Sequence, residues 1–216
     1  MKKYELTSET KTIFGKKLYR IRALVDVGNT VKAGDLGGYI ESEYNLSQDG
    51  NAWVFDNARV YGNAQVCGDA QVYGNAWVCG DAQVYGHAGV CGDALVSDNA
   101  LVSDNARVSG DARVCGDAWV YGNAWVSGDA QVYGNARVSG NAWVCGDASI
   151  YWISNIGSRN DTTTFFRTKD GISVACGCFF GTIDKFAEAV NKTHGDNEHG
   201  QVYRLAIEIA KTKIKE

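Results

Sequence analysis

The sequence predicts a mainly β protein: a parallel β-helix wound as a triangular prism of between five and six coils, with a small β cap before it and an α+β cap after it. Three observations predict this fold. Seventeen hexapeptides run without interruption from Gly50 to Tyr151, their apolar residues recur with a period of two, and a turn-forming pair precedes every strand.

Each hexapeptide predicts a short strand followed by a corner. In GDAQVY, Gly68 to Tyr73, small apolar, variable, aliphatic and aromatic residues alternate as in a strand with one buried face. Ala and Val should therefore point inward and their neighbours outward. Because Gly-Asp and Gly-Asn pairs tolerate left-handed and turn conformations, the chain should turn every six residues and close a coil every eighteen.

No hexapeptide is expected to be stable alone. Burying one Val and one Ala contributes ~2–3 kcal/mol, whereas ordering six residues costs roughly 1–2 kcal/mol each in backbone entropy. Stacked coils share one core and pair their strands, which removes the shortfall. The absence of Pro from the chain suits an unbroken ladder of backbone donors.

The segments on either side of the repeats should cover the open strand edges of the prism. Residues 1–49 contain strand-like runs at 3–6, 17–24 and 38–41, which predict a β cap. Residues 152–216 should form a hairpin of 163–169 and 172–179 around Asp170-Gly171, then a helix from Thr182 to Gly195 and a second helix that includes Val202, Leu205, Ala206 and Ile209. Trp152 is expected to pack on the last coil.

Composition narrows the range of partners. The net charge is −4, and the repeats contain ten Asp against four Arg, so the prism should repel nucleic acid. No apolar leader segment and no run of eighteen apolar residues is present, which predicts a cytoplasmic protein that does not bind membranes. The seven cysteines are expected to be free, since those in the repeats never face one another in adjacent coils.

The repeat V-[YCS]-G-[DN]-A-x resembles that of hexapeptide-repeat, left-handed parallel β-helix proteins, and the left hand of the coil is implied by this resemblance alone. With GDLGGYIE at Gly34 to Glu41 and CGCFFGT near the C-terminus, the chain is similar to bacterial and phage members named as transferases or polymer-forming proteins. The resemblance implies fold more strongly than activity.

An acyltransferase of this fold would use a catalytic His beside acyl-CoA, and His87 is the single His within the repeats. It replaces Asn or Asp in a corner, where we expect it to be solvated, with no carboxylate to hold it. A substituted turn residue is therefore favoured over a general base. Cys176 and Cys178, with His194 and His199, suggest half a metal site, but core thiols are favoured, and neither a metal nor a cofactor is expected.

Aromatic and basic residues at the outward positions are the main candidates for binding. Trp125 and Trp143 are eighteen residues apart and should stack, as should Tyr133 and Tyr151. Such stacks either stabilise neighbouring coils or form a subunit interface or ligand groove, with a carboxylate or phosphate bound by Arg107, Arg113 or Arg137. Arg159 and Arg167 could form a second small anion site beside the predicted hairpin.

These observations favour a non-enzymatic scaffold or binding protein that acts through its outer faces as a homodimer or homotrimer, with the resemblance implying a phage or mobile element as its source. One alternative is a counter-defence sponge that captures a nucleotide-type signal between subunits. The other alternative is an acyltransferase that uses acyl-CoA, which rests on the resemblance.

Overall fold

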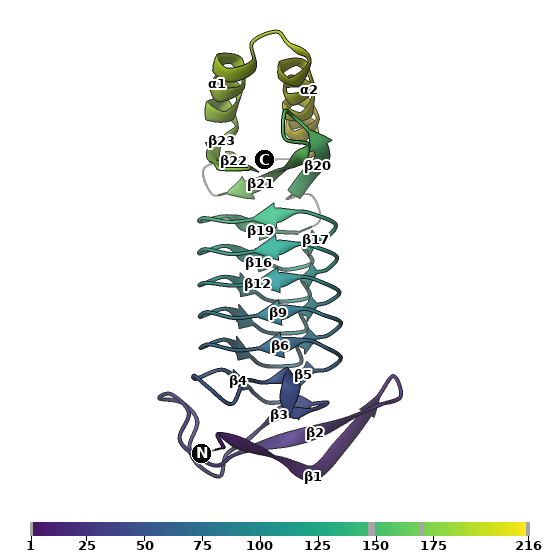
Figure 1. Ribbon diagram of the computed structural model, residues 1–216, viewed down its shortest axis with the longest axis vertical. Helices are drawn as coiled ribbons and strands as arrows, with labels where there is room; N and C mark the ends of the chain where they lie inside the picture. The colour runs from purple at the N-terminus through teal and green to yellow at the C-terminus, as the bar shows by residue number, and fades with distance from the viewer. Residues whose placement is uncertain (1, 147–149, 169–170, 215–216) are drawn as a thin grey trace.

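The computed structural model describes residues 2–146, 150–168 and 171–214, which form one elongated body with a prism in its middle (Figure 1). Three parallel sheets run along the prism, and each strand pairs with the strands eighteen residues before and after it. Leu95, for example, lies opposite Trp77 in one neighbouring coil and Arg113 in the other. This register confirms the three-sided coil predicted from the repeat, while the hand of the coil stays a prediction.

The strands of the prism are two or three residues long and form three faces. The first face contains β5 (Arg59–Val60), β8 (Trp77–Val78), β11 (Leu95–Val96), β14 (Arg113–Val114) and β17 (Gln131–Val132). The second, called the β10 face below, contains β4 (Trp53–Val54), β7 (Gln71–Val72), β10 (Gly89–Val90), β13 (Arg107–Val108), β16 (Trp125–Ser127) and β19 (Trp143–Cys145). The third contains β6 (Gln65–Val66), β9 (Gln83–Val84), β12 (Leu101–Val102), β15 (Trp119–Val120) and β18 (Arg137–Val138).

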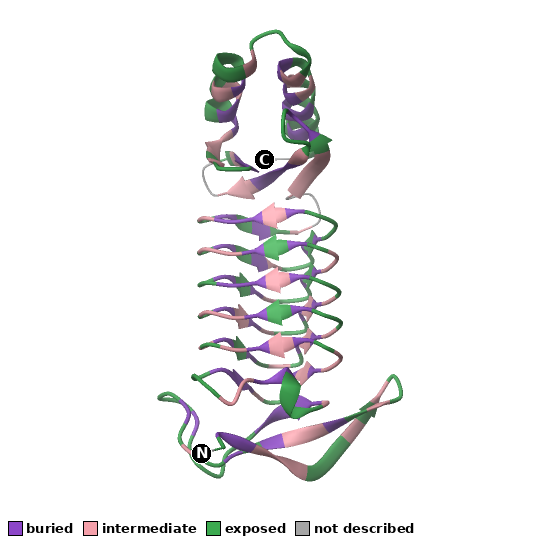
Figure 2. Cartoon of the chain, viewed as in Figure 1, coloured by how far each residue is buried: buried purple, intermediate pink, exposed green. Residues whose placement is uncertain are grey.

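The core of the prism consists of the Ala and Val of each repeat. From Ala52 and Val54 to Ala142 and Val144 these side chains are almost fully buried, in one continuous cluster. They form the buried stripes between exposed corners in Figure 2. The predicted inward and outward alternation is therefore confirmed.

The corners need a left-handed backbone. Gly110 has φ of +69°, and a Cβ built on it would lie 3.0 Å from the backbone N of Gly128 in the next coil. Asp98 has φ of +58° at an equivalent position, and its carboxylate accepts a hydrogen bond of 3.0 Å from the N–H of Gly116. Asp tolerates this conformation better than other side chains because it can hydrogen-bond locally.

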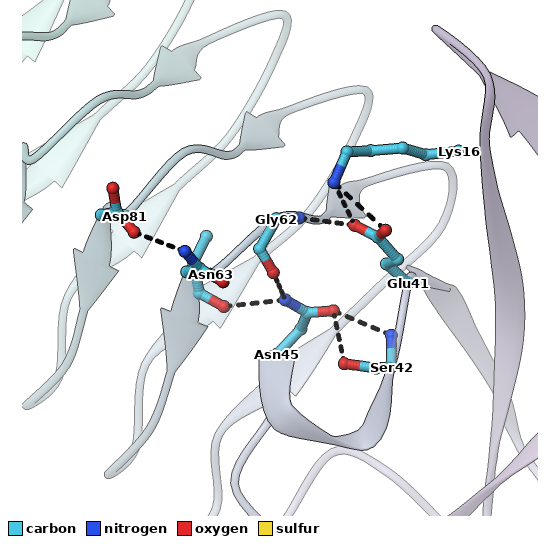
Figure 3. Close-up of polar contacts among 8 residues, drawn as sticks. Lys16, Glu41, Ser42, Asn45, Gly62, Asn63 and Asp81 are labelled. Atoms are coloured by element: carbon cyan, nitrogen blue, oxygen red, sulfur yellow. Dashed lines mark hydrogen bonds and ion pairs between the residues drawn. The ribbon is translucent and has the colours of Figure 1, made fainter.

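Neighbouring corners are also joined by side chains. Asn63 donates to the Asp81 carboxylate one coil on at 2.8 Å (Figure 3), and Asn99 donates in the same way to Asp117 at 2.9 Å. These amide-to-carboxylate contacts give part of the acidic repeat sequence a structural role.

The N-terminal end of the prism is covered by a β sheet that continues its first face. β1 (Tyr4–Ile13), β2 (Lys16–Ala23) and β3 (Leu36–Ile40) are antiparallel, and β3 then pairs in parallel with β5. A short 3-10 helix, η1 (Glu43–Asn45), follows. The β cap predicted for this end is therefore present.

Polar side chains satisfy the backbone of the first coil. Asn45 donates to the carbonyls of Gly62 at 3.0 Å and Ala64 at 2.9 Å, while Glu41 accepts from the N–H of Gly62 at 2.7 Å (Figure 3). The ammonium group of Lys3, which is only 4% exposed, donates to the Ala52 carbonyl at 3.0 Å.

The C-terminal end carries an antiparallel sheet with two helices standing on it (Figure 1). Its strands are β20 (Ile150–Ile156), β21 (Asp161–Thr168), β22 (Gly171–Cys176) and β23 (Phe179–Thr182), and the helices are α1 (Ile183–His194) and α2 (Glu198–Lys213). Thr182 caps α1 and Gly195 ends it, as predicted.

This sheet closes the prism with apolar side chains. Phe166 is fully buried and belongs to the prism core, and Trp152 packs edge-on against Tyr133 with ring centroids 4.3 Å apart. The hydroxyl of Thr164 accepts a hydrogen bond of 3.0 Å from the N–H of Arg137 in the third face. The expected contact of Trp152 with the end of the prism is confirmed, and Phe166 is an additional plug.

The end of the repeat was predicted wrongly. Ile150 and Tyr151 belong to β20, which pairs with β21, and not to a last strand of the prism. No Gly-Asp or Gly-Asn pair follows Tyr151, so the chain does not turn and runs straight on to Ile156.

Two details of the C-terminal segment also differ from expectation. The second strand of the hairpin ends at Cys176, so Cys178 lies exposed in the turn before β23, while Asp170 lies outside the described residues. In α2 the buried residues include Tyr203 and Ala206, and Leu205 and Ile209 are exposed. Tyr203 lies on the buried side of α2, where its ring packs against Phe186 of α1.

Six of the cysteines, Cys67, Cys79, Cys91, Cys115, Cys176 and Cys178, are free thiols, as expected. Among the described residues, no helix combines the length and apolar character needed to cross a bilayer.

Two glycines at different repeat positions should respond oppositely to substitution. Gly110→Ala should lower the free energy of unfolding by about 1–3 kcal/mol, since Ala is strained at this φ and approaches Gly128. Gly89→Ala should be neutral or stabilising by about 0.4–1 kcal/mol, because Gly89 lacks a positive φ and its Cβ position is open. Urea denaturation measures both.

Gly110→Asp is the matched control at the corner. It should cost less than Gly110→Ala, because its carboxylate can accept the N–H of the next coil as Asp98 does. Equal losses for Gly110→Ala and Gly89→Ala would contradict this account of the corners.

Burial of Lys3 predicts a pH dependence of stability. Burial lowers the pKa of Lys3 from 10.5 to about 8, although the charges of Asp49 and Asp69 oppose the shift. Between these two values the unfolded chain binds more protons, so the contribution of Lys3 to the free energy of unfolding rises with pH. Wild-type protein should therefore gain stability relative to Lys3→Met from about pH 7 to about pH 10 in urea denaturation.

Cysteine and tyrosine side chains also lose protons at alkaline pH. They are present in both proteins, so their effect cancels in the difference in free energy of unfolding between wild type and Lys3→Met. If this difference stays constant or falls as the pH rises, burial does not disfavour the charged form of Lys3.

Candidate functional site

The outward column of the β10 face is interrupted at one position. From the N-terminal to the C-terminal coil, this column consists of Trp53, Gln71, Gly89, Arg107, Trp125 and Trp143. Gly89 is the single Gly at the variable position of the repeats in the whole sequence, and beyond its two chain neighbours no described residue has an atom within 4 Å of the place where its Cβ would be. Gln71 and Arg107 are thus separated by a gap one side chain deep.

This gap opens into a hollow of about 510 Å³, called the Gly89 hollow below. One wall is the connection between β2 and β3, which contributes residues 27–30. The opposite wall is the β10 face and its corners. The residues that line the hollow are Val27, Gly28, Asn29, Thr30, Asn51, Asp69, Gln71, Tyr73, His87, Ala88, Gly89 and Arg107.

His87 lies in this hollow with a carboxylate partner. Its Nδ1 is 3.4 Å from Oδ2 of Asp69, while Oδ1 of Asp69 accepts a hydrogen bond of 2.8 Å from the side chain of Asn51. The expectation that no carboxylate holds His87 was therefore wrong. Asp69 and His87 are eighteen residues apart, so the coil places them at the same corner. The His87 side chain is still 69% exposed.

Tyr73 and Arg107 also line the hollow, Tyr73 from the coil of Gln71 and Arg107 from the coil after Gly89. A hydrogen bond to the Cys91 thiol, together with burial, raises the pKa of Tyr73, and the charge of Arg107 opposes this rise. Among the described residues, no carboxylate forms an ion pair with Arg107. A guanidinium without a partner, facing a polar hollow, favours an anionic ligand.

A stacked tryptophan pair continues the column beyond Arg107. Arg107 lies opposite Trp125 in the strand register, and Trp125 lies opposite Trp143. The two indole rings are 5.7 Å apart at an interplanar angle of 10°, which confirms the predicted stack. The side chains are exposed by 42% and 46%, so their outer edges form an apolar surface next to the hollow.

The other predicted residues of the prism do not join this site. Arg113 lies on the first face and Arg137 on the third, where the Arg137 guanidinium lies 5.0 Å from the ring centroid of Trp119. The expected stack of Tyr133 and Tyr151 is absent, because Tyr151 lies in β20, outside the prism. Its ring packs on that of Phe165, with ring centroids 5.9 Å apart.

Arg159 and Arg167 are not brought together. Arg159 lies in the turn before β21, and Arg167 lies near the far end of β21, opposite Ile172. The small anion site predicted from this pair is therefore not formed. Arg159 instead lines a separate hollow beside α1.

Metal coordination finds no support in the described parts of the chain. They hold no group of three or more His, Cys, Asp and Glu side chains arranged to bind an ion. A smaller, mainly apolar hollow of about 280 Å³, lined by Thr30, Phe55, Asp56, Gln71 and Tyr73, adjoins the Gly89 hollow and shares three of these residues with it.

Sequence reasoning missed three parts of this site. The Asp69 partner was available from the coil period, and the missing side chain at position 89 was visible as the one Gly in the variable column. The wall formed by residues 27–30 had no signal, because a connection between two strands does not reveal which surface it folds against.

Comparison with known sequences supports the fold. The repeats match the family described as YdcK beta solenoid repeat over residues 52–68, 64–80, 70–86, 100–116, 112–128 and 130–146, all within the prism. No curated protein matches the chain. The match supports a β-solenoid and leaves the activity to be argued from the site.

Proposed function

We propose that this chain is a non-enzymatic β-solenoid that binds a small anionic ligand on its β10 face, in the Gly89 hollow. The observation that carries the proposal is the gap at Gly89, which brings Arg107, His87 and Tyr73 around one recess. Scattered polar residues on a regular prism would not converge in this way, whereas ligand sites are concave and hold a few converging polar groups.

The lining indicates the class of ligand. Arg107 supplies a planar donor for a carboxylate or phosphate. The amides of Asn29 and Gln71 and the hydroxyl of Thr30 can form hydrogen bonds with a ligand rich in hydroxyl groups. The Asp69 carboxylate can accept hydrogen bonds from the hydroxyl groups of such a ligand. A sugar acid or sugar phosphate combines both properties. A nucleotide shares them and adds a planar base, for which Trp125 offers a stacking surface one coil beyond Arg107.

Acyl transfer is the alternative, and the contact between His87 and Asp69 favours it. A carboxylate that orients a His is the arrangement of a general base. The exposure of His87 argues for the binding role, because a base acting on a bound nucleophile works better when water is excluded.

We further propose that two or three copies of the chain associate through the β10 face. The stacked indoles of Trp125 and Trp143 form an apolar surface of a kind that is enriched at the centre of interfaces. A second copy placed there would also narrow the open side of the Gly89 hollow, which suits capture of a ligand between subunits.

The ligand proposal is tested by variants matched within the repeat. Arg107→Gln should weaken binding about tenfold to a hundredfold, because a charge-assisted hydrogen bond is lost. Arg113→Gln, at the same repeat position on the first face, should leave affinity unchanged. Calorimetric titration with glucose 6-phosphate, glucuronate and AMP measures the affinity. Glucose and inorganic phosphate, titrated separately, measure the contributions of the sugar and of the anionic group.

Gly89→Gln provides a second test, since Gln already occupies this position at Gln71 and Gln83. It should fill the hollow and abolish binding while the melting temperature is kept or raised. The proposal fails if none of the five compounds binds, or if Arg113→Gln weakens binding as much as Arg107→Gln. Turnover of acetyl-CoA that is lost in His87→Ala would support acyl transfer instead.

The assembly proposal predicts that Trp125→Ser combined with Trp143→Ser converts the oligomer to a monomer in light scattering at micromolar concentration. Trp119→Ser is the control, because Trp119 is similarly exposed, by 43%, but lies on the third face. A monomeric wild-type protein, or an unchanged mass of the double variant, would contradict this role of the indole pair.

A further inference from the structure

A second hollow lies at the opposite end of the molecule, beside the C-terminal helices. It has a volume of about 330 Å³, is open on one side, and is bordered by α1, by the turn between β20 and β21, and by the turn between β22 and β23. Its lining is mainly apolar and includes Phe179, Phe186, Ala189 and Val190, together with Tyr203 of α2. This composition contrasts with the polar Gly89 hollow.

The aromatic rings of this hollow form a connected wall. Phe179 and Phe186 have ring centroids 5.1 Å apart, Phe186 and Tyr203 are 5.4 Å apart, and His194 lies 5.6 Å from Tyr203. Rings that pack on one another hold their positions, so they present a fixed apolar surface to a flat or chain-like apolar group.

The buried polar atoms of this lining already have partners. The hydroxyl of Tyr203 lies 3.6 Å from Sγ of Cys176, and this sulfur also accepts a hydrogen bond of 3.1 Å from Thr163. Burial and the contact with Cys176 raise the pKa of Tyr203 to about 12, although the charge of Arg159 opposes the rise. Tyr203 therefore stays protonated and adds no negative charge to the hollow.

Among the described residues that line this hollow, Arg159 is the one Lys or Arg. Its guanidinium lies directly over Gly177, where a Cβ would collide with Nη2, so the glycine leaves the space that this group occupies. Within the described chain no acidic side chain pairs with Arg159. An unpaired guanidinium beside an apolar recess matches a ligand with a negative end and an apolar body.

We infer that this hollow binds a small carboxylate with an aromatic or alkyl body, whose carboxylate accepts hydrogen bonds from Arg159 and whose body lies against Phe186 and Tyr203. A phosphate dianion or a sugar fits poorly, because the apolar walls would leave its polar groups without partners. The site is independent of the Gly89 hollow, and its function goes beyond the one proposed for that hollow.

Calorimetric titration of the full chain with indole-3-acetate and octanoate tests this inference, with the neutral indole-3-acetamide as the matched control. The acids should bind, and the amide should bind at least about tenfold more weakly because it lacks the charge. Arg159→Gln should remove the preference for acid over amide, whereas Arg167→Gln should preserve it, since Arg167 does not line the hollow. Ala189→Trp should fill the hollow and abolish binding of both acids.

The inference is overturned if neither acid binds, if the amide binds as tightly as indole-3-acetate, or if Arg159→Gln keeps the preference for the acid. Circular dichroism melting of each variant shows whether it is folded, and Arg159 is exposed, so its substitution should leave the fold intact. The Gly89→Gln variant should bind the acids normally, which separates this site from the one on the β10 face.

Discussion

Each coil of the prism donates its backbone N–H groups to the carbonyls of the next coil, as from Arg107 to Ala124 at 2.9 Å, and the same register repeats along every face. Because paired residues are eighteen positions apart and the repeat is six residues long, each residue lies directly over a residue of the same repeat position. Ala therefore packs on Ala, Val on Val, and the outward side chains form straight columns. An insertion in one coil would disturb its pairing with both neighbours.

The two ends of the ladder stop in different ways. At the N-terminal end, β3 adds one more paired strand, and buried polar groups such as Asn45 and Lys3 bond the remaining carbonyls. At the C-terminal end the chain turns to an antiparallel sheet, whose Phe166 enters the prism core. One end thus continues the strand pairing, whereas the other combines apolar contact with a side-chain hydrogen bond from the N–H of Arg137 to Thr164. Both arrangements keep strand edges from pairing with further chains.

Most of the fold could be predicted from the sequence, because a strict repeat reports its own geometry. The coil of eighteen, the buried Ala and Val columns, the Trp125–Trp143 stack and the capped helix α1 all follow from local patterns. Predictions failed where two patterns competed. Tyr151 matches the repeat pattern, but no corner residues follow it. In α2 two apolar stripes overlap, and tertiary packing buries the one that contains Tyr203.

The candidate site was only half visible. His87 and Arg107 were identified as separate candidates, and their convergence depends on a missing side chain at Gly89 and on a connection that folds back against the prism. Residue types alone do not show such a convergence, because it depends on distances between coils and on the path of an irregular segment. The coil period places Arg113 and Arg137 on other faces than Arg107, but it does not show which face carries the hollow.

The missing side chain at Gly89 has a consequence for how the β10 face can evolve by substitution. All rungs share one backbone, so exchanging the residues at positions 71 and 89 would shift the recess along the axis by one rung, about 4.8 Å, without altering the ladder. Specificity on this architecture therefore moves in discrete steps, through point mutations on a scaffold whose stability they barely touch. In a solenoid of this kind, large and small outward side chains can be rearranged among the coils while the backbone ladder stays the same.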